Sequence, residues 1–250
     1  MVWMGRLKGG RPVGRLAAAA IVAFTMIHAA EASDLQPGIF GTDDRVPAPE
    51  RPEWSAVGQV NIGGQRARRL CSGTLIGPRL VLTAAHCVWN DWRQRLFLLD
   101  RIHFVAGVRP GNTFAAHSKA DCLRIPAGYP KDAPDIALIV LKDPIKTVPA
   151  FAMDREPDLP VGTAITHAAY PADRRFQLML HRNCKVVGRS PGRIATDCDT
   201  HEASSGGPLF VETPAGMEIV GVLAGVVRGK ASIATTLDAW PDMSLDPTCP

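Results

Sequence analysis

The sequence predicts an all-β protein, and two observations support this. From Val57 onward, short apolar runs alternate with turn residues such as Gly77-Pro78. No long segment keeps an apolar period of about 3.6 residues between capping signals, so helices should be few and short. Many short strands separated by turns are typical of an antiparallel β sandwich or barrel. The runs that predict strands are 74–76, 80–82, 102–105, 136–141, 177–180 and 219–223.

Charge and composition exclude two classes of protein. Hydrophobic residues make up 46% of the 250 residues and charged residues 21%, which is typical of a folded globular chain. Most of the net charge of +4 comes from residues 1–32, which hold 4 of the 28 basic residues and 1 of the 24 acidic ones. The remaining 24 basic and 23 acidic side chains form no basic block, so nucleic-acid binding is not expected.

Residues 1–32 are predicted to be an export signal. A basic start is followed by the apolar run 16–27 and by the small-x-small motif Ala30-Glu31-Ala32. The alternative is a membrane anchor, but the run is shorter than the ~20 residues that span a bilayer. We therefore expect a periplasmic or secreted protein that is not membrane-bound after cleavage. Residues 33–54, rich in Gly and Pro, are expected to be an extended lead-in or a propeptide region.

The six cysteines fit an oxidising compartment. An even number in an exported chain predicts three disulfides, although spacing alone leaves their pairing open. None shows the C-x-x-C spacing of a zinc site, so no metal is expected. These cysteines are Cys71, Cys87, Cys122, Cys184, Cys198 and Cys249.

Three local stretches carry side chains suited to acyl transfer. Residues 82–87 place His86 at the end of an apolar strand, and Asp135 stands directly before the apolar run 136–141. Residues 198–208 contain Ser205, followed by two glycines and a proline. A serine hydroxyl becomes nucleophilic when an imidazole takes its proton, and a carboxylate orients that imidazole. Glycines let backbone N–H groups approach a developing oxyanion.

These stretches resemble the active-site signatures of the trypsin-like serine protease family. The stretches are Thr83-Ala-Ala-His-Cys87, Asp135-Ile-Ala-Leu138 and Ser205-Gly-Gly-Pro208, in the chain order of the family. Residues 41–45 and 198–200 resemble the secreted bacterial branch that includes glutamyl endopeptidases. The resemblance covers about residues 41–240. It implies two packed antiparallel six-stranded β barrels, at 55–150 and 151–250, and a protein or peptide substrate.

By the same resemblance, each site residue receives a role. His86 would be the general base, Asp135 its orienting acid and Ser205 the nucleophile. The backbone N–H groups of Ala203 and Ser205 would form the oxyanion hole, with no cofactor. The resemblance also implies the disulfides Cys71–Cys87 and Cys184–Cys198. By loop entropy, the first would stabilise the folded state by about 3 kcal/mol. Cys122 and Cys249 then remain for the third. The chain is expected to act as a monomer.

The sequence departs from the family just before the nucleophile. Where relatives have Gly-Asp-Ser, this chain has Ala203-Ser204-Ser205. The Cβ of Ala203 opposes the backbone conformation that exposes its N–H, so Ala203→Gly is predicted to raise turnover. Ser204 has no carboxylate to pair with a new N-terminus, which disfavours that mode of activation. Ser204 is an alternative nucleophile, but the adjacent glycines favour Ser205.

The predicted substrate preference depends on which of two roles Asp199 has. It lies six residues before Ser205, where trypsin carries the acid that binds basic side chains, but it could equally be a structural hydrogen-bonding group. Leu223 occupies the place of the histidine that holds glutamate in glutamyl endopeptidases, which disfavours that preference. The strand containing Leu223 and Gly225 is expected to bind extended substrate by backbone pairing. His201 and Glu202 are candidates for substrate contact.

Two functions follow. The first is a secreted serine endopeptidase that acts through an acyl-enzyme on Ser205. The second is a protease-like binding scaffold that has lost most catalysis, an alternative raised by Ala203. The complete set of His86, Asp135 and Ser205 favours the enzyme.

Overall fold

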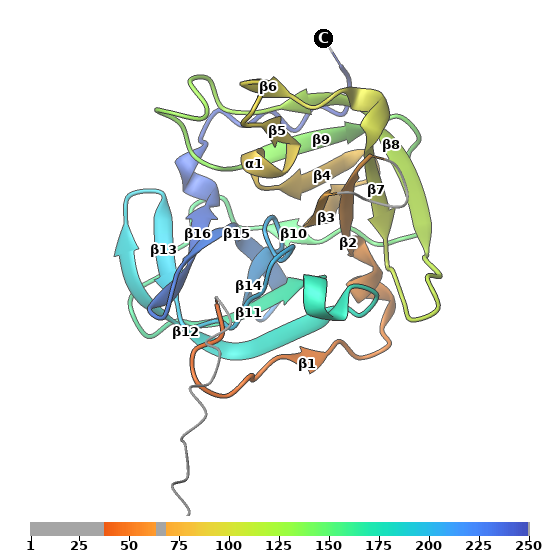
Figure 1. Ribbon diagram of the computed structural model, residues 1–250. Coiled ribbons are helices and arrows are strands. Elements are labelled where there is room, and N and C mark those ends of the chain that lie inside the picture. Colours follow the sequence, from red (N-terminus) through yellow and green to blue (C-terminus); the bar gives the residue numbers. More distant parts are fainter. Residues whose placement is uncertain (1–37, 64–68, 250) are drawn as a thin grey trace, which may run out of the picture. The chain divides into compact units, whose positions relative to one another are not determined.

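The computed structural model describes residues 38–63 and 69–249 (Figure 1). The predicted signal 1–32 and the start of the lead-in lie outside these residues. Regular structure in the described part is almost entirely β-strand, as predicted. Its one α-helix is Ala85–Val88 (α1), and short 3-10 turns occur at Pro52–Ala56 (η1), Leu99–Arg101 (η2), Ala172–Arg174 (η3) and Leu237–Ala239 (η4).

Six strands of the N-terminal half close into a barrel in the order β2-β3-β4-β9-β8-β7. Closure pairs every strand on both sides and leaves no open edge. The predicted Gly77-Pro78 turn joins β3 to β4. Large apolar side chains such as Leu75, Phe104 and Ile139 fill the interior. The bounds are Val57–Ile62 (β2), Arg69–Gly77 (β3), Leu80–Thr83 (β4), Ile102–Ala106 (β7), Ala116–Arg124 (β8) and Ala137–Leu141 (β9).

Six strands of the C-terminal half form a second closed set. The order is β12-β11-β14-β15-β16-β13, and the additional β12–β13 pairing closes the ring. Ile165, Ile194 and Val220 belong to its interior. The bounds are Ala164–Ala169 (β11), Met179–Ser190 (β12), Arg193–Thr196 (β13), Pro208–Thr213 (β14), Gly216–Val227 (β15) and Ala231–Thr236 (β16). The expected pair of six-stranded antiparallel barrels is therefore confirmed.

A shared apolar core joins the two barrels. Leu82 and Leu138 of the first barrel and Phe210 of the second belong to one buried cluster. The ring of Phe210 lies 4.6 Å from that of Phe151 and 5.8 Å from that of Trp54, centroid to centroid. Burial of such aromatic side chains fixes how the barrels meet, and the loops at this junction are held accordingly.

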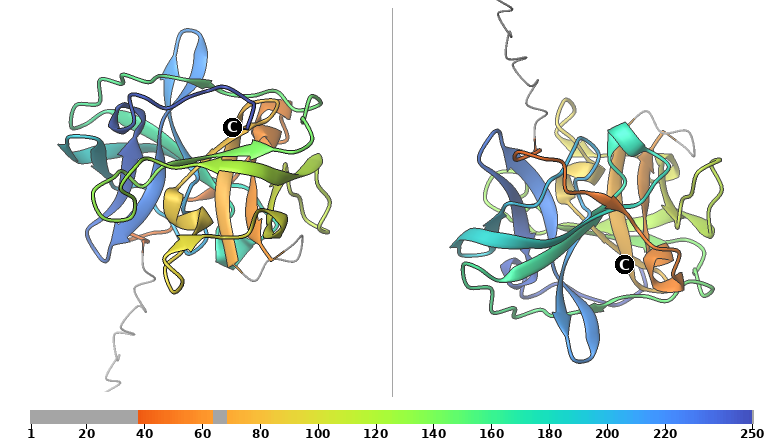
Figure 2. Two further views of the ribbon diagram at one scale, coloured as in Figure 1. Left: turned by 90° about the horizontal axis from the view of Figure 1, so that it is seen from above. Right: turned by 90° about the horizontal axis from the view of Figure 1, so that it is seen from below.

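The described part of the lead-in packs against the second barrel. Val46–Pro47 (β1) pairs antiparallel with β12, and Figure 2 (right) shows this orange segment crossing the outside of the teal strands. The Arg45 side chain, 3% exposed, contacts Asp43 and Asp173 at 2.8 Å each. Its hydrogen bond to Asp43 lowers the pKa of that carboxyl to about 2. The segment is thus fastened by backbone pairing and by buried charge.

Shorter elements and three disulfides complete the structure. Trp89–Asn90 (β5) and Arg95–Leu96 (β6) form a hairpin, and Ala152–Met153 (β10) pairs parallel with β15. The disulfides Cys71–Cys87 and Cys184–Cys198 have the pairing that the resemblance implied, and the two remaining cysteines form Cys122–Cys249. No helix in the described residues is long and apolar enough to cross a bilayer.

Candidate active site

Strand register brings His86 and Asp135 together. Thr83 at the end of β4 lies opposite Ala137 at the start of β9, so the residues just beyond each strand are neighbours. His86 follows in α1, and Asp135 lies directly before the apolar run of β9. The Nδ1 of His86 is 2.7 Å from Oδ2 of Asp135, and its backbone N–H donates to Oδ1 at 2.9 Å. Both carboxylate oxygens therefore hold this one histidine.

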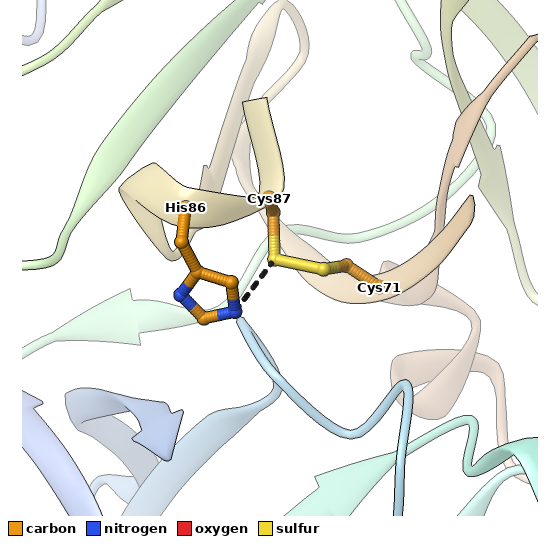
Figure 3. A group of neighbouring side chains, drawn as sticks. All are labelled: Cys71, His86 and Cys87. Atoms are coloured by element: carbon orange, nitrogen blue, oxygen red, sulfur yellow. Dashed lines mark hydrogen bonds between the residues drawn. A yellow bond between two sulfur atoms is a disulfide. The ribbon is translucent and has the colours of Figure 1, made fainter. Parts of the chain in front are cut away.

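This contact also sets the chemistry of the imidazole. Donation from Nδ1 to a carboxylate leaves Nε2 with its lone pair, ready to accept a proton. Figure 3 shows the Nε2 edge of His86 beside the Cys71–Cys87 disulfide, 3.8 Å from Sγ of Cys87. The His86 side chain is 23% exposed and that of Asp135 21%. The pair is thus partly shielded from water and still open to a ligand.

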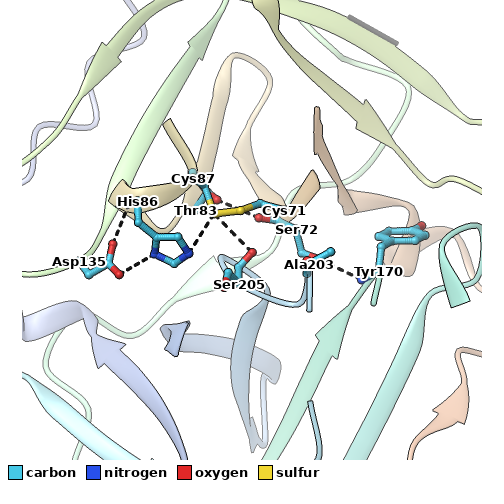
Figure 4. Close-up of a disulfide and its surroundings, with 9 residues drawn as sticks. All are labelled: Cys71, Ser72, Thr83, His86, Cys87, Asp135, Tyr170, Ala203 and Ser205. Atoms are coloured by element: carbon cyan, nitrogen blue, oxygen red, sulfur yellow. Dashed lines mark hydrogen bonds and ion pairs between the residues drawn. A yellow bond between two sulfur atoms is a disulfide. The ribbon is translucent and has the colours of Figure 1, made fainter. Parts of the chain in front are cut away.

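Ser205 reaches the pair from the second barrel. It lies in the loop between β13 and β14, and its carbonyl oxygen accepts a hydrogen bond from the N–H of Ser72 at 2.8 Å. The Ser72 contact ties the loop to β3 of the first barrel, and Figure 4 shows Ser205 next to the His86 ring. Among the described residues no hydrogen bond joins its Oγ to Nε2 of His86. Such bonds are often long in ligand-free sites and shorten with substrate.

Ala203 adopts the backbone conformation that its Cβ was expected to oppose. Its φ is +69°, in the left-handed region that costs a non-glycine residue roughly 1–2 kcal/mol. The backbone N–H groups of Ala203 and Ser205 donate no hydrogen bond within the described chain, whereas those of Ser204, Gly206 and Gly207 do. Two free donors flanking the Ser205 hydroxyl are the arrangement an oxyanion hole needs.

Ser72 holds the carbonyl side of this loop. Its hydroxyl donates to the carbonyl oxygen of Ala203 at 3.1 Å and accepts the N–H of Tyr170 at 2.9 Å. In turn, Oγ1 of Thr83 donates to the carbonyl of Ser72 at 2.8 Å. Because the Ala203 carbonyl is anchored, the peptide that follows cannot rotate freely. The strained loop is therefore held from the first barrel.

Gly206 is required by space as well as by φ. It has φ +78°, and a Cβ there would collide with the side chain of Thr83 and the backbone of Ser72. Its N–H donates to the carbonyl of Leu223 at 2.7 Å. The first glycine of the Ser-Gly-Gly-Pro motif thus lets the serine loop press against the opposite barrel.

Ser204 has a structural position. It is 1% exposed, its Oγ accepts the N–H of His201 at 3.2 Å and its own N–H donates to the His201 carbonyl at 3.0 Å. Ser205, by contrast, is only half-buried. A hydroxyl turned into the loop and already bonded is poorly placed to attack a substrate.

Asp199 faces the N-terminal segment. Its Oδ1 accepts the N–H of Phe40 at 2.8 Å and its Oδ2 that of Asp44 at 2.9 Å, and the residue is 2% exposed. Oδ2 is also 3.5 Å from Nδ1 of His181, but that nitrogen accepts the Asp199 N–H at 2.7 Å and so carries no proton. This contact is therefore not an ion pair. Both oxygens are committed to backbone donors.

Leu223 and Gly225 lie on β15, beside the serine loop. The Leu223 side chain is buried in the second barrel, and its backbone exchanges hydrogen bonds with Gly206 and Gly207. No atom lies within 4 Å of where a Cβ on Gly225 would be, so this backbone borders open space. Leu223 therefore serves packing, whereas the Cβ side of Gly225 is left uncovered.

The other histidines and the donor clusters take structural places. His201 lies 3.8 Å from Asp173, and the Glu202 side chain is exposed. His167 is buried next to Gly207, and burial lowers its pKa to about 3.

Two groups of possible metal donors occur in the described residues. One includes two disulfide sulfurs, and the donor atoms of Asp199 and His181 in the other already bind backbone N–H groups.

Ser72 and Thr83 are the positioning residues that sequence reasoning missed. Ser72 directly follows Cys71, and Thr83 is the first residue of the recognised motif Thr83-Ala-Ala-His-Cys87, in which only His86 and Cys87 received roles. Their role depends on contacts across the two barrels, which no local pattern reveals.

Comparison with known proteins defines the class. The trypsin family model matches residues 44–238, most of the chain, and the chain therefore belongs to the trypsin family. The glutamyl endopeptidase of Bacillus licheniformis is 26% identical over 182 residues, which cover 70% of this chain and 55% of that protein. The chain thus spans about half the length of this relative. The cercarial protease of Schistosoma mansoni is 24% identical, with 72% of this chain and 76% of that protein covered.

Solved structures share the fold. A Glu endopeptidase in complex with MPD superposes with a TM-score of 0.69 at 22% identity, covering 80% of this chain and 94% of that one. The VesB protease of Vibrio cholerae gives a TM-score of 0.64 at 20% identity, covering 80% of this chain and 65% of that one. At these identities the likeness concerns the double-barrel fold.

Proposed function

We propose that this chain is an exported serine endopeptidase in which His86, Asp135 and Ser205 form the catalytic triad. The observation that carries the proposal is the pair of contacts between Asp135 and His86, beside an accessible Ser205. Oδ2 of Asp135 is 2.7 Å from Nδ1 of His86, and Oδ1 accepts the His86 backbone N–H at 2.9 Å. Membership of the trypsin family supports it. The six paired cysteines support export, because disulfides persist in oxidising compartments.

The proposed reaction has two balanced steps. Ser205 Oγ attacks the peptide carbonyl while its proton passes to Nε2 of His86, and the oxyanion accepts hydrogen bonds from the N–H groups of Ala203 and Ser205. The imidazolium then gives that proton to the leaving amine as the C–N bond breaks. Water repeats the sequence on the acyl-enzyme, releasing the acid and restoring the serine. The chemistry needs no cofactor.

Asp199 is proposed to brace the fold instead of binding a basic substrate side chain. Support comes from its two hydrogen bonds to the N-terminal segment and its near-complete burial. The same contacts lead us to propose that the mature protein keeps the chain from about Gly38 onward. Removing that stretch would leave a buried carboxylate unpaired.

Hydrolysis of labelled casein by the purified exported form tests the proposed function. Ser205→Ala should abolish hydrolysis, and Ser204→Ala should keep most of it because Ser204 serves the loop. Asp135→Asn should retain the fold and lose activity by roughly 10⁴, since the imidazole is then held in the wrong tautomer. Equal loss from both serine variants would reject the assigned nucleophile. An inactive wild type would favour the binding-scaffold alternative.

A further inference from the structure

Four arginines line one pocket on the first barrel, next to the candidate active site. The pocket has a volume of about 520 Å³ and an apolar floor that includes Leu96 and Phe97. Its arginines come from separate elements that the fold brings together: β3, the β5–β6 hairpin and η2. They are Arg69, Arg93, Arg95 and Arg101.

None of these four guanidinium groups pairs with a carboxylate of the described chain. Asp91 and Asp100 are close in sequence but form no ion pair with them, whereas Arg45, Arg79 and Arg174 elsewhere are all paired. Arg69 instead lies over the ring of Phe97, 5.8 Å from its centroid. Like charges gathered around a concave surface create a positive potential that favours an anionic ligand.

The pocket adjoins the elements that hold His86. The N–H of Phe97 donates to the carbonyl of Val88, the last residue of α1, at 2.9 Å. Arg69 precedes Cys71 by two residues in β3, and Cys71 is bonded to Cys87, the neighbour of His86. The pocket is therefore fixed to the side of the site where the disulfide lies.

That side is where the leaving half of a substrate must emerge. In the proposed reaction Nε2 of His86 delivers its proton to the leaving amine, so this amine lies close to Nε2. Nε2 is 3.8 Å from Sγ of Cys87 (Figure 3). A chain continuing from the amine on this side would pass the disulfide, and β3 carries Arg69 only two residues before Cys71.

An exposed tryptophan beside the pocket is suited to contact a polypeptide ligand. Trp92 lies in the turn of the β5–β6 hairpin, next to Arg93, and is 98% exposed. Tryptophan and arginine are among the residues enriched at binding hot spots of macromolecular interfaces. A free small anion would gain nothing from Trp92.

We propose that this pocket binds acidic side chains of protein substrates that follow the cleaved bond. The proposal rests on the peptidase function proposed above and names a substrate class for it: chains with Asp or Glu on the leaving side. Trp92 and the apolar floor contact the same segment. Recognition through exposed charges should weaken with salt, because screening shortens their range to about 3 Å at 1 M.

Digestion of a proteome-derived peptide library, read by mass spectrometry, tests the inference. The proteins compared are wild type, the double variant Arg93→Gln/Arg95→Gln and the control Arg193→Gln, which removes an exposed arginine from β13. Wild type and control should enrich Asp and Glu after the cleaved bond. The double variant should lose about two- to fivefold of its preference for a Glu peptide over the matched Gln peptide, given the usual strength of exposed ion pairs.

Two outcomes would overturn the inference, and they are distinguishable by labelling each preparation with a fluorophosphonate. Labelled wild type without acidic enrichment, or with enrichment that survives in the double variant or in 1 M salt, rejects the pocket alone. Absence of both labelling and cleavage rejects the proposed peptidase and this inference with it. Retained labelling in the double variant shows that any loss of preference concerns binding of the leaving segment.

Discussion

The hydroxyl of Ser72 donates a hydrogen bond to the carbonyl oxygen of Ala203 across the junction of the two barrels, at 3.1 Å. This contact meets Ala203, one of the two residues at which the serine loop departs from the family pattern. Ala203 has φ +69°, and the anchored carbonyl keeps the following peptide from turning over. The peptides on either side carry the N–H groups of Ala203 and Ser205, which donate no hydrogen bond within the described chain.

Replacing Ser72 with alanine should slow catalysis without preventing folding. The loop then loses its anchor, and we expect kcat to fall about tenfold, less than the 10²–10³-fold cost of deleting an oxyanion donor. KM should change little, since no ground-state contact is removed. The matched control is Ser118→Ala, another buried serine of the first barrel that bonds Asp143. Similar kcat losses in both variants would assign Ser72 a purely structural role.

The effect of a substitution at Ala203 on the free energy of unfolding should depend on backbone strain. Glycine removes the cost of a left-handed alanine but adds unfolded-state entropy, so Ala203→Gly should change the free energy of unfolding by ~1 kcal/mol or less. Ala203→Val should destabilise by about 2 kcal/mol, because a β-branched residue resists positive φ.

Turnover of Ala203→Gly gives the second readout. The sequence predicts a rise, but the structure already presents both donors, so we now expect turnover within about twofold of wild type. Urea unfolding and kcat measured on the same preparations check both parts. A large rise would mean that alanine holds the donors out of place in solution.

Asp199→Asn should cost stability and leave cleavage preference unchanged. The amide keeps one acceptor but turns an N–H₂ group toward the N–H of Phe40 or Asp44, which leaves buried donors facing each other. We expect a loss of about 2 kcal/mol in unfolding free energy. Peptide-library profiling supplies the second readout. A selective loss of cleavage after Lys or Arg would place Asp199 in substrate recognition after all.

Stability should fall on acidification because His167 is buried without a hydrogen-bond partner at Nε2. Burial lowers its pKa to about 3 from an unfolded value near 6.5, so the unfolded chain binds more protons between these values. The contribution of neutral His167 is complete above pH ~6.5 and is lost as pH falls toward 3. His167→Gln should flatten the curve of unfolding free energy in that window. An unchanged slope would assign the acid sensitivity to other groups.

Local patterns predicted much of this protein because its chemistry sits in contiguous motifs. The strand before His86, the apolar run after Asp135 and the glycines after Ser205 each mark a backbone environment that the reaction requires. The β-rich architecture followed from the same short runs. Division into two barrels came from family resemblance, since strand order depends on pairings far apart in sequence.

What the sequence could not predict depends on contacts between distant segments. Asp199 bonds to residues more than 150 positions away, and Ser72 acts on a loop 131 positions along the chain. The arginine pocket likewise gathers residues from three elements whose neighbourhood only the closed barrel defines. In each case the residue type was visible while its partner was not.

Labelling of the purified exported protein with a fluorophosphonate, followed by peptide mapping, tests whether Ser205 is an activated nucleophile. We predict a single adduct on Ser205, lost in Ser205→Ala, retained in Ser204→Ala and formed much more slowly in His86→Ala. An adduct on Ser204, or no adduct on a folded protein, would contradict the assignment of Ser205 as an activated nucleophile.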